Sequence, residues 1–389
     1  MAVKLPIYMD HNATTPLDPR VFEAMRPFFM DVFGNAASRG HSFGWEAEAA
    51  VDKARQQVAA LLNARPDAIV WTSGSTEANN LAIKGAAEAH VERGRHIITQ
   101  VTEHKAVLDC CKRLKKYGFE TTWLGVDSKG RISLDELRES IRPDTILVSV
   151  MWANNEIGTI LPVRELAEAA AEFGVPLHSD AVQAFGQVPV DFAASGLAAM
   201  TLSGHKIGGP YGIGALVLGR EHTPVPVLHG GGQERHVRSG TLDVPAIASF
   251  AVAGRLAAEQ REWFAREIGA LRDALVAAVR EAVPDAVLGG DPAPGGRLPA
   301  NAHFTFPGCE GDSLLLLLDA QGIECSTGSA CTAGVAQPSH VLLATGTDPD
   351  LARGTLRFSL GHTSTEADVE ALAKAIGPAV ERARAAGLT

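Results

Sequence analysis

The sequence predicts an α/β protein with a large domain built on a mainly parallel seven-stranded sheet and a smaller α+β domain. Between about residues 66 and 220, short runs rich in β-branched residues alternate with helical patterns. Such alternation is typical of a parallel sheet covered by helices on both faces. The pattern changes after a long helical stretch and a Gly/Pro-rich loop at 289–301, which indicates a second unit.

The strands and helices can be assigned in chain order. An amphipathic helix over 163–174 is one of the connections expected between neighbouring strands. The expected strands of the large sheet are 68–73, 96–101, 121–126, 146–153, 176–181, 199–204 and 213–219.

The second unit follows a helical pattern over 250–283 that is long for a globular protein. Its small sheet is expected to include the N-terminal segment as well. We therefore predict a large domain at 16–255 and a small domain at 1–15 and 256–389. The elements expected in the last third are a strand at 302–306, a helix at 310–322, a cysteine-containing loop, a short helix, a strand at 355–361 and a helix at 364–386.

Composition narrows the classes of ligand and location. The chain has 35 Lys and Arg against 45 Asp and Glu, and it has no long basic run, so nucleic acid or an anionic membrane is not expected as the main ligand. The N-terminus lacks the apolar core of a signal peptide, and no apolar run approaches a membrane span. We expect a cytoplasmic protein whose five cysteines are reduced. Without CxxC or HExxH spacing, no metal site is predicted.

Polar residues follow several predicted strands, where ligands collect in open α/β sheets. A strand runs into Gly74, Ser75 and Thr76 and then into a helix, so N–H groups and hydroxyls there suit a phosphate. The alternative is an ordinary Ser or Thr helix cap. His104 follows the next strand, and a single histidine is more often structural than catalytic.

The remaining two strand ends carry an acid and a lysine. Asp180 and Gln183 follow an apolar strand, where a carboxylate needs solvent, a salt bridge to an arginine, or a protonated ring nitrogen. Lys206 follows another strand, between Ser203-Gly204-His205 and a glycine pair, where a lysine can lose its charge and attack a carbonyl carbon. A phosphate site, a ring-stacking histidine, a carboxylate and a lysine together are what pyridoxal 5′-phosphate requires.

Nine motifs extend this interpretation, and through them the sequence resembles the cysteine desulfurases of the class V aminotransferase group, which are fold-type I pyridoxal phosphate enzymes. The pairing of "SGHK" with "GSAC" is specific to the desulfurases. The motifs are "YMDHNATTP" (8–16), "TSGSTEANNLAIKG", "TEHKAVL", "VSVMWANNEIGTI", "HSDAVQAFGQ", "SGHKIGGPYGIGAL", "GGGQERHVRSGT", "STGSACTAG" and "LRFSLG".

The resemblance implies a role for each matching residue. Lys206 corresponds to the lysine that bonds the cofactor, His104 to the histidine stacked on its ring, and Cys331 to the thiol that receives sulfur. Asp180 corresponds to the partner of the ring nitrogen and Gln183 to the donor for the ring hydroxyl oxygen. The residues that bind the cofactor phosphate correspond to Ser75, Thr76, Ser203 and His205, with Thr241 contributed by the other subunit. The residues that hold the substrate correspond to Asn155 and Arg357.

Arg357 would, without the resemblance, be interpreted as a surface charge at a strand end. Cys325 lies outside the motif and is expected to be a buried small residue, with a second working thiol as the alternative. The longer "SACTAG" form of the loop resembles the iron–sulfur-cluster type that acts without an obligatory activator.

The implied protein is a homodimer that converts L-cysteine to L-alanine and a Cys331 persulfide. Its sulfur would go to an iron–sulfur scaffold or a tRNA-thiolation protein. Another class V reaction, by an aminotransferase or a selenocysteine lyase, is the alternative.

Overall fold

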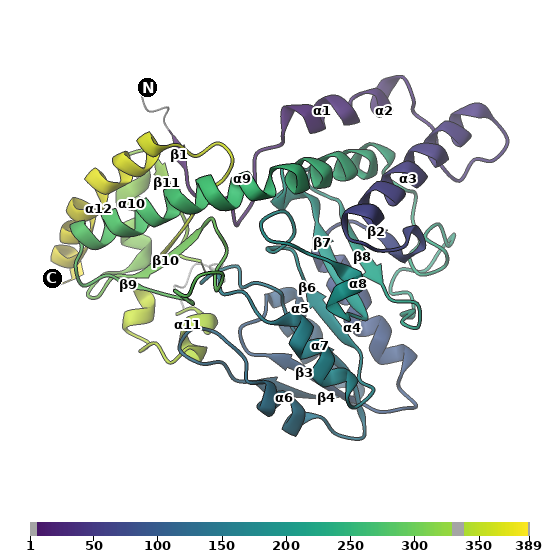
Figure 1. Cartoon of the computed structure of the whole chain (residues 1–389), viewed down its shortest axis with the longest axis horizontal. Helices are drawn as coiled ribbons and strands as arrows, with labels where there is room; N and C mark the ends of the chain where they lie inside the picture. Colours follow the sequence, from purple (N-terminus) through teal and green to yellow (C-terminus); the bar gives the residue numbers. More distant parts are fainter. Residues whose placement is uncertain (1–5, 329–337, 388–389) are drawn as a thin grey trace.

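The computed structural model describes residues 6–328 and 338–387. Its central feature is a seven-stranded sheet in the order β2-β8-β7-β6-β5-β3-β4 (Figure 1). All neighbouring strands are parallel except β8, which is antiparallel to both β2 and β7. The strands are β2 (Ile69–Thr72), β3 (His96–Gln100), β4 (Glu120–Leu124), β5 (Thr145–Ser149), β6 (Leu177–Asp180), β7 (Ala199–Ser203) and β8 (Gly214–Leu218). All seven predicted strands are confirmed.

Helices cover both faces of this sheet, as the apolar strands require. One face packs against α4 (Ser75–Ala89) and α5 (Lys105–Leu114), through residues such as Ile83 and Val107. The other face packs against a larger set, which comprises α3 (Ser42–Leu61), α6 (Leu134–Ser140), α7 (Val163–Ala171) and the first turns of α9 (Val244–Ala282).

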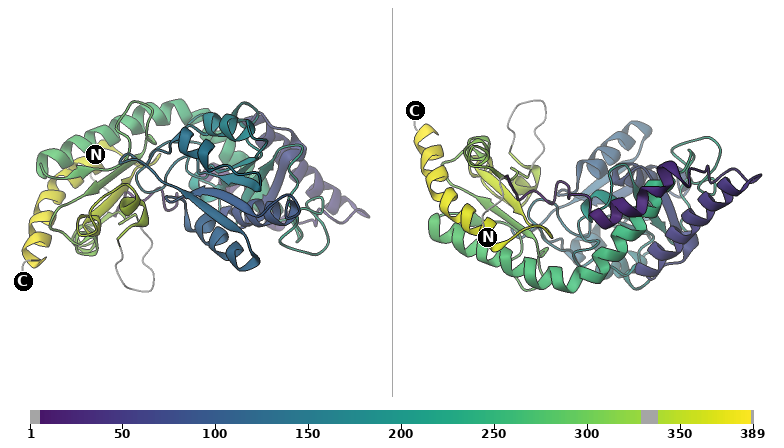
Figure 2. Two further views of the ribbon diagram at one scale, coloured as in Figure 1. Left: turned by 90° about the horizontal axis from the view of Figure 1, so that it is seen from below. Right: turned by 90° about the horizontal axis from the view of Figure 1, so that it is seen from above.

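The long helix α9 joins the two halves of the molecule and runs along one side of both (Figure 2). It begins at Val244, six residues before the predicted start, because the side chain of Asp243 accepts a hydrogen bond from the Ala246 N–H and a proline follows in the first turn. The predicted boundary at residue 255 falls inside this helix, so the division into domains stays a prediction.

The second half is built on a three-stranded antiparallel sheet in the order β12-β10-β9. Its core is closed by the second half of α9 together with α10 and α12. The elements are β9 (Val287–Leu288), β10 (Asn301–Thr305), α10 (Gly311–Asp319), α11 (His340–Ala344), β12 (Thr355–Ser359) and α12 (Glu366–Gly387).

The N-terminal segment joins this half in a different way from the prediction. Strand β1 (Ile7–Tyr8) pairs in parallel with β11 (Ile323–Glu324) as a separate two-stranded sheet, which isolated bridges from Asp10 to Ser359 and from Ser326 to Arg357 connect to β12. The segment then crosses to the large half, where Asp18 donates its backbone N–H to the Gly208 carbonyl at 3.0 Å.

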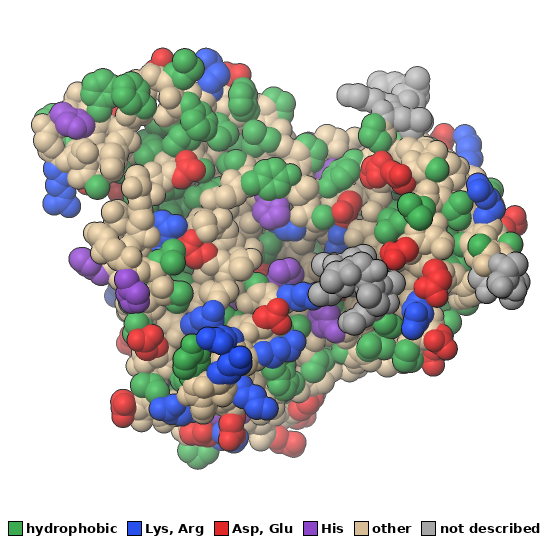
Figure 3. Space-filling view, turned by 180° about the vertical axis from the view of Figure 1, so that it is seen from behind, with side chains coloured by type: hydrophobic (Ala, Val, Ile, Leu, Met, Phe, Trp, Pro, Cys, Tyr) green, Lys and Arg blue, Asp and Glu red, His purple; other side chains and the backbone are tan. Residues whose placement is uncertain are grey.

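The surface is mixed in charge despite the formal net charge of −10. One face carries a gathering of Lys and Arg side chains, seen low in Figure 3. Lys84, Arg95 and Arg113 line a surface pocket in the large half. Within the described part of the chain, no helix combines the length and hydrophobicity that a membrane span needs.

The ion pair between Arg55 and Glu234 provides a stability test. The Glu234 side chain is completely buried, contacts the Arg55 guanidinium at 2.7 Å and accepts a bond from the Trp71 N–H at 3.0 Å. We expect Glu234→Ala to lower the free energy of unfolding by about 3–5 kcal/mol, because it leaves an arginine buried without its partner. Urea denaturation should show less than about 0.5 kcal/mol for Glu168→Ala, which breaks an exposed pair with Arg164.

Candidate active site

The predicted site residues converge on a cavity of about 1000 Å³, including its open mouth, between the two halves. The strand ends of the large sheet supply most of its lining, and β12 closes it from the small half. Of the predicted residues, the cavity is lined by Ser75, Thr76, His104, Asn155, Asp180, Gln183, His205, Lys206 and Arg357.

Lys206 lies just past β7 with its amine held by backbone carbonyls. Its Nζ donates to the Asn12 oxygen at 2.5 Å and the Ala13 oxygen at 2.7 Å. Burial, helped by the nearby positive charge of Arg357 and opposed by Asp10 and Asp180, lowers the pKa of Lys206 from 10.5 to about 8. The neutral, nucleophilic form of the amine is therefore far more populated near pH 7 than it is in an ordinary lysine.

Asp180 is buried at the end of β6 and is held by two N–H donors. Its Oδ2 accepts from Asn79 Nδ2 at 2.7 Å and its Oδ1 from the Val182 N–H at 3.0 Å. Nearby Gln183 donates its Nε2–H to the Asn12 carbonyl at 2.9 Å, so the N-terminal segment contacts both Gln183 and Lys206.

The turn before α4 is shaped by glycines. The N-cap of α4 is Gly74, at a φ of 143° that favours glycine, so neither Ser75 nor Thr76 acts as the side-chain cap considered as an alternative. A side chain at Gly214 on β8 would come within 2.8 Å of the Gly74 Cα, so Gly214 allows this turn to approach the sheet. The first N–H groups of α4 and two hydroxyl side chains therefore border the cavity.

The histidines occupy different positions. His104 is exposed at the mouth and caps α5, where its Nδ1 accepts from the Ala106 N–H at 3.1 Å. His205 contacts Thr14 Oγ1 at 3.2 Å, and burial lowers its pKa to about 4, so it is neutral at pH 7. Ser203 is buried at the end of β7, and Thr241 is exposed, away from the cavity of its own chain.

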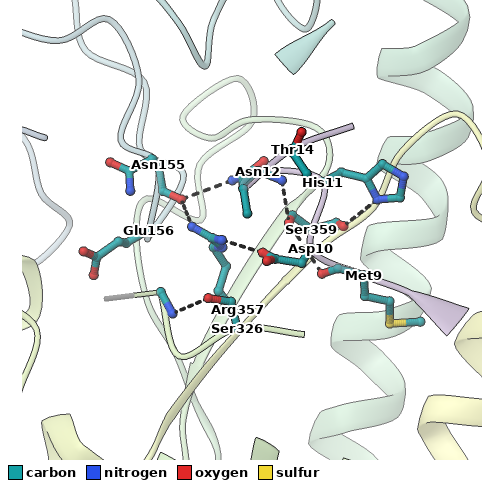
Figure 4. Close-up of polar contacts among 12 residues, drawn as sticks. Met9, Asp10, His11, Asn12, Thr14, Asn155, Glu156, Ser326, Arg357 and Ser359 are labelled. Atoms are coloured by element: carbon teal, nitrogen blue, oxygen red, sulfur yellow. Dashed lines mark hydrogen bonds and ion pairs between the residues drawn. The ribbon is translucent and has the colours of Figure 1, made fainter. Parts of the chain in front are cut away.

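Arg357 corrects the interpretation of a surface charge at a strand end. It lies in the middle of β12 with only 4% of its surface exposed, donating to the Asn155 carbonyl at 2.9 Å and contacting Asp10 Oδ1 at 2.5 Å. Figure 4 shows the guanidinium between Asn155 and Asp10. Its buried Nε–H has no acceptor among the described residues.

Of the two cysteines in the loop, the described residues include only Cys325. Cys331 lies outside the described residues. Cys325 is partly exposed rather than fully buried, packs against the core of the small half, and has a thiol pKa raised by burial. A raised pKa disfavours the thiolate, which is the nucleophilic form. Cys110 and Cys111 are buried, as predicted.

Sequence reasoning missed several residues that shape the cavity. Asp10 pairs with Arg357, Asn12 contacts Lys206 and Gln183, and Asn79 holds Asp180. Glu103 is also buried, and burial together with Asp180 raises its pKa well above the usual value. All four stand inside the quoted motifs, which was the available signal, and Glu103 directly precedes the assigned His104.

Comparison with known proteins decides the family. Residues 7–372 match the family described as aminotransferase class-V. The chain is 52% identical to the IscS-like cysteine desulfurase of Mycobacterium tuberculosis (strain ATCC 25618 / H37Rv) over 98% of both chains. It is 44% identical to the cysteine desulfurase of Mus musculus, covering 98% of this chain and 83% of that one. The chain belongs to the cysteine desulfurase family of class V aminotransferases.

Solved structures agree with this family. A NifS-like protein superposes with a TM-score of 0.91 at 37% identity, covering 97% of this chain and 100% of that one. DndA from Streptomyces lividans superposes with a TM-score of 0.76 at 38% identity, covering 89% and 97% of the two chains. The fold is accordingly fold-type I.

Pyridoxal 5′-phosphate is the cofactor of this family, and the residues present fit it. The cavity brings together an amine that can lose its proton, a buried carboxylate and the N-terminus of α4. These groups match the aldehyde, the ring nitrogen and the phosphate of the cofactor. Within the described residues, no group of three His, Cys, Asp or Glu side chains is arranged to hold a metal ion.

The lowered pKa of Lys206 predicts how the cofactor binds. Apoprotein mixed with pyridoxal phosphate should regain cofactor absorbance at a rate that rises with pH with a midpoint near pH 8, because only the neutral amine reacts. Stopped-flow absorbance between pH 6.5 and 10.5 would measure this profile. A midpoint near the ordinary lysine value of 10.5 would contradict the environment described for Lys206.

Proposed function

We propose that this chain is a cysteine desulfurase that removes sulfur from L-cysteine, yielding L-alanine and a persulfide on Cys331. The observation that carries the proposal is one cavity that holds both Lys206, with its lowered pKa, and the buried guanidinium of Arg357. The first suits a reaction at an amino group, and the second suits an α-carboxylate. The relatives bearing the name cysteine desulfurase support the same substrate.

We assign the binding roles as follows. Arg357 and Asn155 hold the substrate, with the free Nε–H of Arg357 directed to its carboxylate. For the cofactor, Asp180 pairs with the ring nitrogen, Gln183 donates to the ring oxygen and His104 stacks on the ring. Its phosphate is bound by Ser75, Thr76, Ser203, His205 and the partner subunit's Thr241.

In the proposed reaction, the cofactor stabilises charge on the substrate and residues of this chain transfer the protons. When bound, pyridoxal phosphate supplies an electron sink that stabilises negative charge at the substrate Cα. Lys206 takes the Cα proton on its neutral amine, and its pKa of about 8 suits both accepting and returning a proton. His104 stands at the mouth, where it can accept the proton of the substrate thiol.

Cys331 then attacks the substrate sulfur as a thiolate. A sulfur–sulfur bond forms as the substrate Cβ–S bond breaks, its electron pair stays with carbon, and proton uptake there gives alanine. No external oxidant is needed, because the carbon is reduced as the two sulfurs are joined. Release as sulfide requires a reductant, whereas an acceptor thiol that attacks the outer sulfur takes it over as a new persulfide and frees the Cys331 thiolate.

We further propose a cytoplasmic homodimer that delivers sulfur to an iron–sulfur scaffold or a tRNA-thiolation protein. The exposure of Thr241 outside the cavity of its own chain supports a contribution across a subunit interface.

The role of Cys331 can be tested with holoenzyme, L-cysteine and dithiothreitol. Wild type should form alanine and sulfide in equal amounts, whereas Cys331→Ala should keep the cofactor absorbance and lose sulfide release, because the attacking thiolate is gone. Cys325→Ala is the matched control and should keep both products. Sulfide release by Cys331→Ala at the wild-type rate would remove Cys331 from the mechanism.

Arg357→Lys tests whether Arg357 binds the α-carboxylate of the substrate. A lysine cannot donate from a planar fork, so the KM for L-cysteine should rise by roughly ten- to a hundredfold, with a smaller change in kcat. Steady-state alanine formation measures both constants. Arg353→Lys, at an exposed position in the preceding turn, should leave KM unchanged. An unaltered KM in Arg357→Lys would mean that another group binds the carboxylate.

A further inference from the structure

Glu156 lies against both described ends of the segment that contains Cys331. Its side chain is buried, and Ser339 Oγ donates to its Oε2 at 2.5 Å. On the other side, a side chain added at Gly328 would come within 3.6 Å of the Glu156 Cγ and Oε2. The Glu156 side chain therefore lies beside Gly328, where the chain leaves the described structure, and accepts a hydrogen bond from Ser339, close to where it returns.

The backbone around Glu156 is held firmly. Asn154 Oδ1 accepts the N–H groups of Glu156 and Ile157, each at 2.9 Å, and Asn154 Nδ2 donates to the Thr102 carbonyl at 3.0 Å. The Glu156 carbonyl accepts from Asn301 Nδ2 at 3.0 Å. Figure 4 shows Glu156 directly after Asn155, with its carboxylate turned away from the Arg357–Asp10 pair.

The start of α11 has a second attachment beside the cavity. Ser339 is the N-cap of this helix, and its Oγ accepts from the N–H groups of Val341 and Leu342 at 3.1 and 3.4 Å. The next residue, His340, contacts the Glu103 carbonyl through Nε2 at 3.0 Å. The first turn of α11 is thus joined to the residue before His104 and to the residue after Asn155.

We propose that Glu156 is a positioning residue that, through Ser339, fixes where the chain re-enters the small half after the Cys331 segment. The proposal rests on the sulfur-accepting role proposed for Cys331. Glu156 itself contacts neither substrate nor cofactor in this assignment. Its effect is to fix the start of α11, the first helix after the Cys331 segment, beside the cavity.

The hydrogen bond favours the ionised form of Glu156. The lone pairs of Ser339 Oγ face two N–H donors, so its single hydrogen is directed to the carboxylate. Burial raises the pKa of Glu156 to about 7, opposed by the Ser339 hydrogen bond and by the charges of Arg357 on β12 and Lys105 on α5. The anchor is therefore strongest above pH 7 and weakens as the pH falls through that value.

The raised pKa of Glu156 makes global stability depend on pH in the opposite direction to the strength of the Glu156–Ser339 hydrogen bond. Because the pKa of Glu156 in the folded protein exceeds the ordinary 4.5, its contribution is fully favourable below pH 4.5 and is lost as the pH rises through about 7. Replacing it by the neutral Gln therefore removes a buried charge, and Glu156→Gln should fold at pH 8. Loss of function in that variant can then be assigned to the anchor.

The test compares holoenzymes of wild type, Glu156→Gln, Ser339→Ala and Ser133→Ala at pH 8. Ser133 is the exposed N-cap of α6, with no carboxylate partner in the described contacts, so Ser133→Ala controls for the loss of a cap alone. Hydrogen–deuterium exchange of peptides covering α6 and α11 gives a readout independent of turnover. The kcat and KM for alanine formation, measured from pH 6 to 9, give the functional readout.

We expect Glu156→Gln and Ser339→Ala to accelerate exchange in α11 and to lower kcat by roughly tenfold, with KM and cofactor absorbance unchanged. Glu156→Gln should also flatten the fall of kcat below pH 7. Ser133→Ala should accelerate exchange in α6 only. The proposal fails if Glu156→Gln matches wild type in α11 exchange and kcat. If instead wild type forms no alanine, the proposed function fails while the exchange results still test the anchor.

Discussion

The site depends on one short N-terminal segment that passes between the two halves of the molecule. The backbone carbonyls of Asn12 and Ala13 hold the Lys206 amine, and the same Asn12 carbonyl accepts from Gln183. Carbonyl oxygens satisfy the amine without placing a full negative charge in direct contact with it. The carboxylate of this segment, on Asp10, is paired with Arg357 instead. This arrangement allows burial to lower the pKa of the lysine.

Three carboxyl groups are buried near the cavity, and each has different surroundings. Asp180 accepts hydrogen bonds from two N–H donors. Glu103, close to that charge and fully enclosed, has its pKa raised well above the usual value. Burial raises the pKa of Glu156 to about 7, against the opposing effects of the Ser339 hydrogen bond and the charges of Arg357 and Lys105. Three acids supplied by neighbouring strand ends are thus suited to different tasks.

The sequence was sufficient for the large sheet but not for contacts between its ends. Apolar strand runs are local signals, so all seven strands lie within or overlap their predicted ranges. The start of α9 also had a local signal, in the Asp243 cap and the proline after it. By contrast, the pairing of Asp10 with Arg357 joins residues 347 positions apart, which no periodicity reveals. The burial of Arg357 was likewise hidden, because an alternating strand does not show which neighbour covers it.

That separation in sequence has a consequence for biosynthesis. A ribosome releases the N-terminal strand first, but its partner β11 and the Arg357 that binds Asp10 emerge only near the end of translation. The large sheet can fold while the chain is still being made, and it holds the N-terminal segment through contacts such as Gln183 to Asn12 and Asp18 to Gly208. The bridge from Asp10 to β12 and the ion pair with Arg357 can form only after β12 has been synthesised. A chain that ends before β12 therefore lacks Arg357 and its pairing with Asp10, so the cavity is complete only in the finished polypeptide.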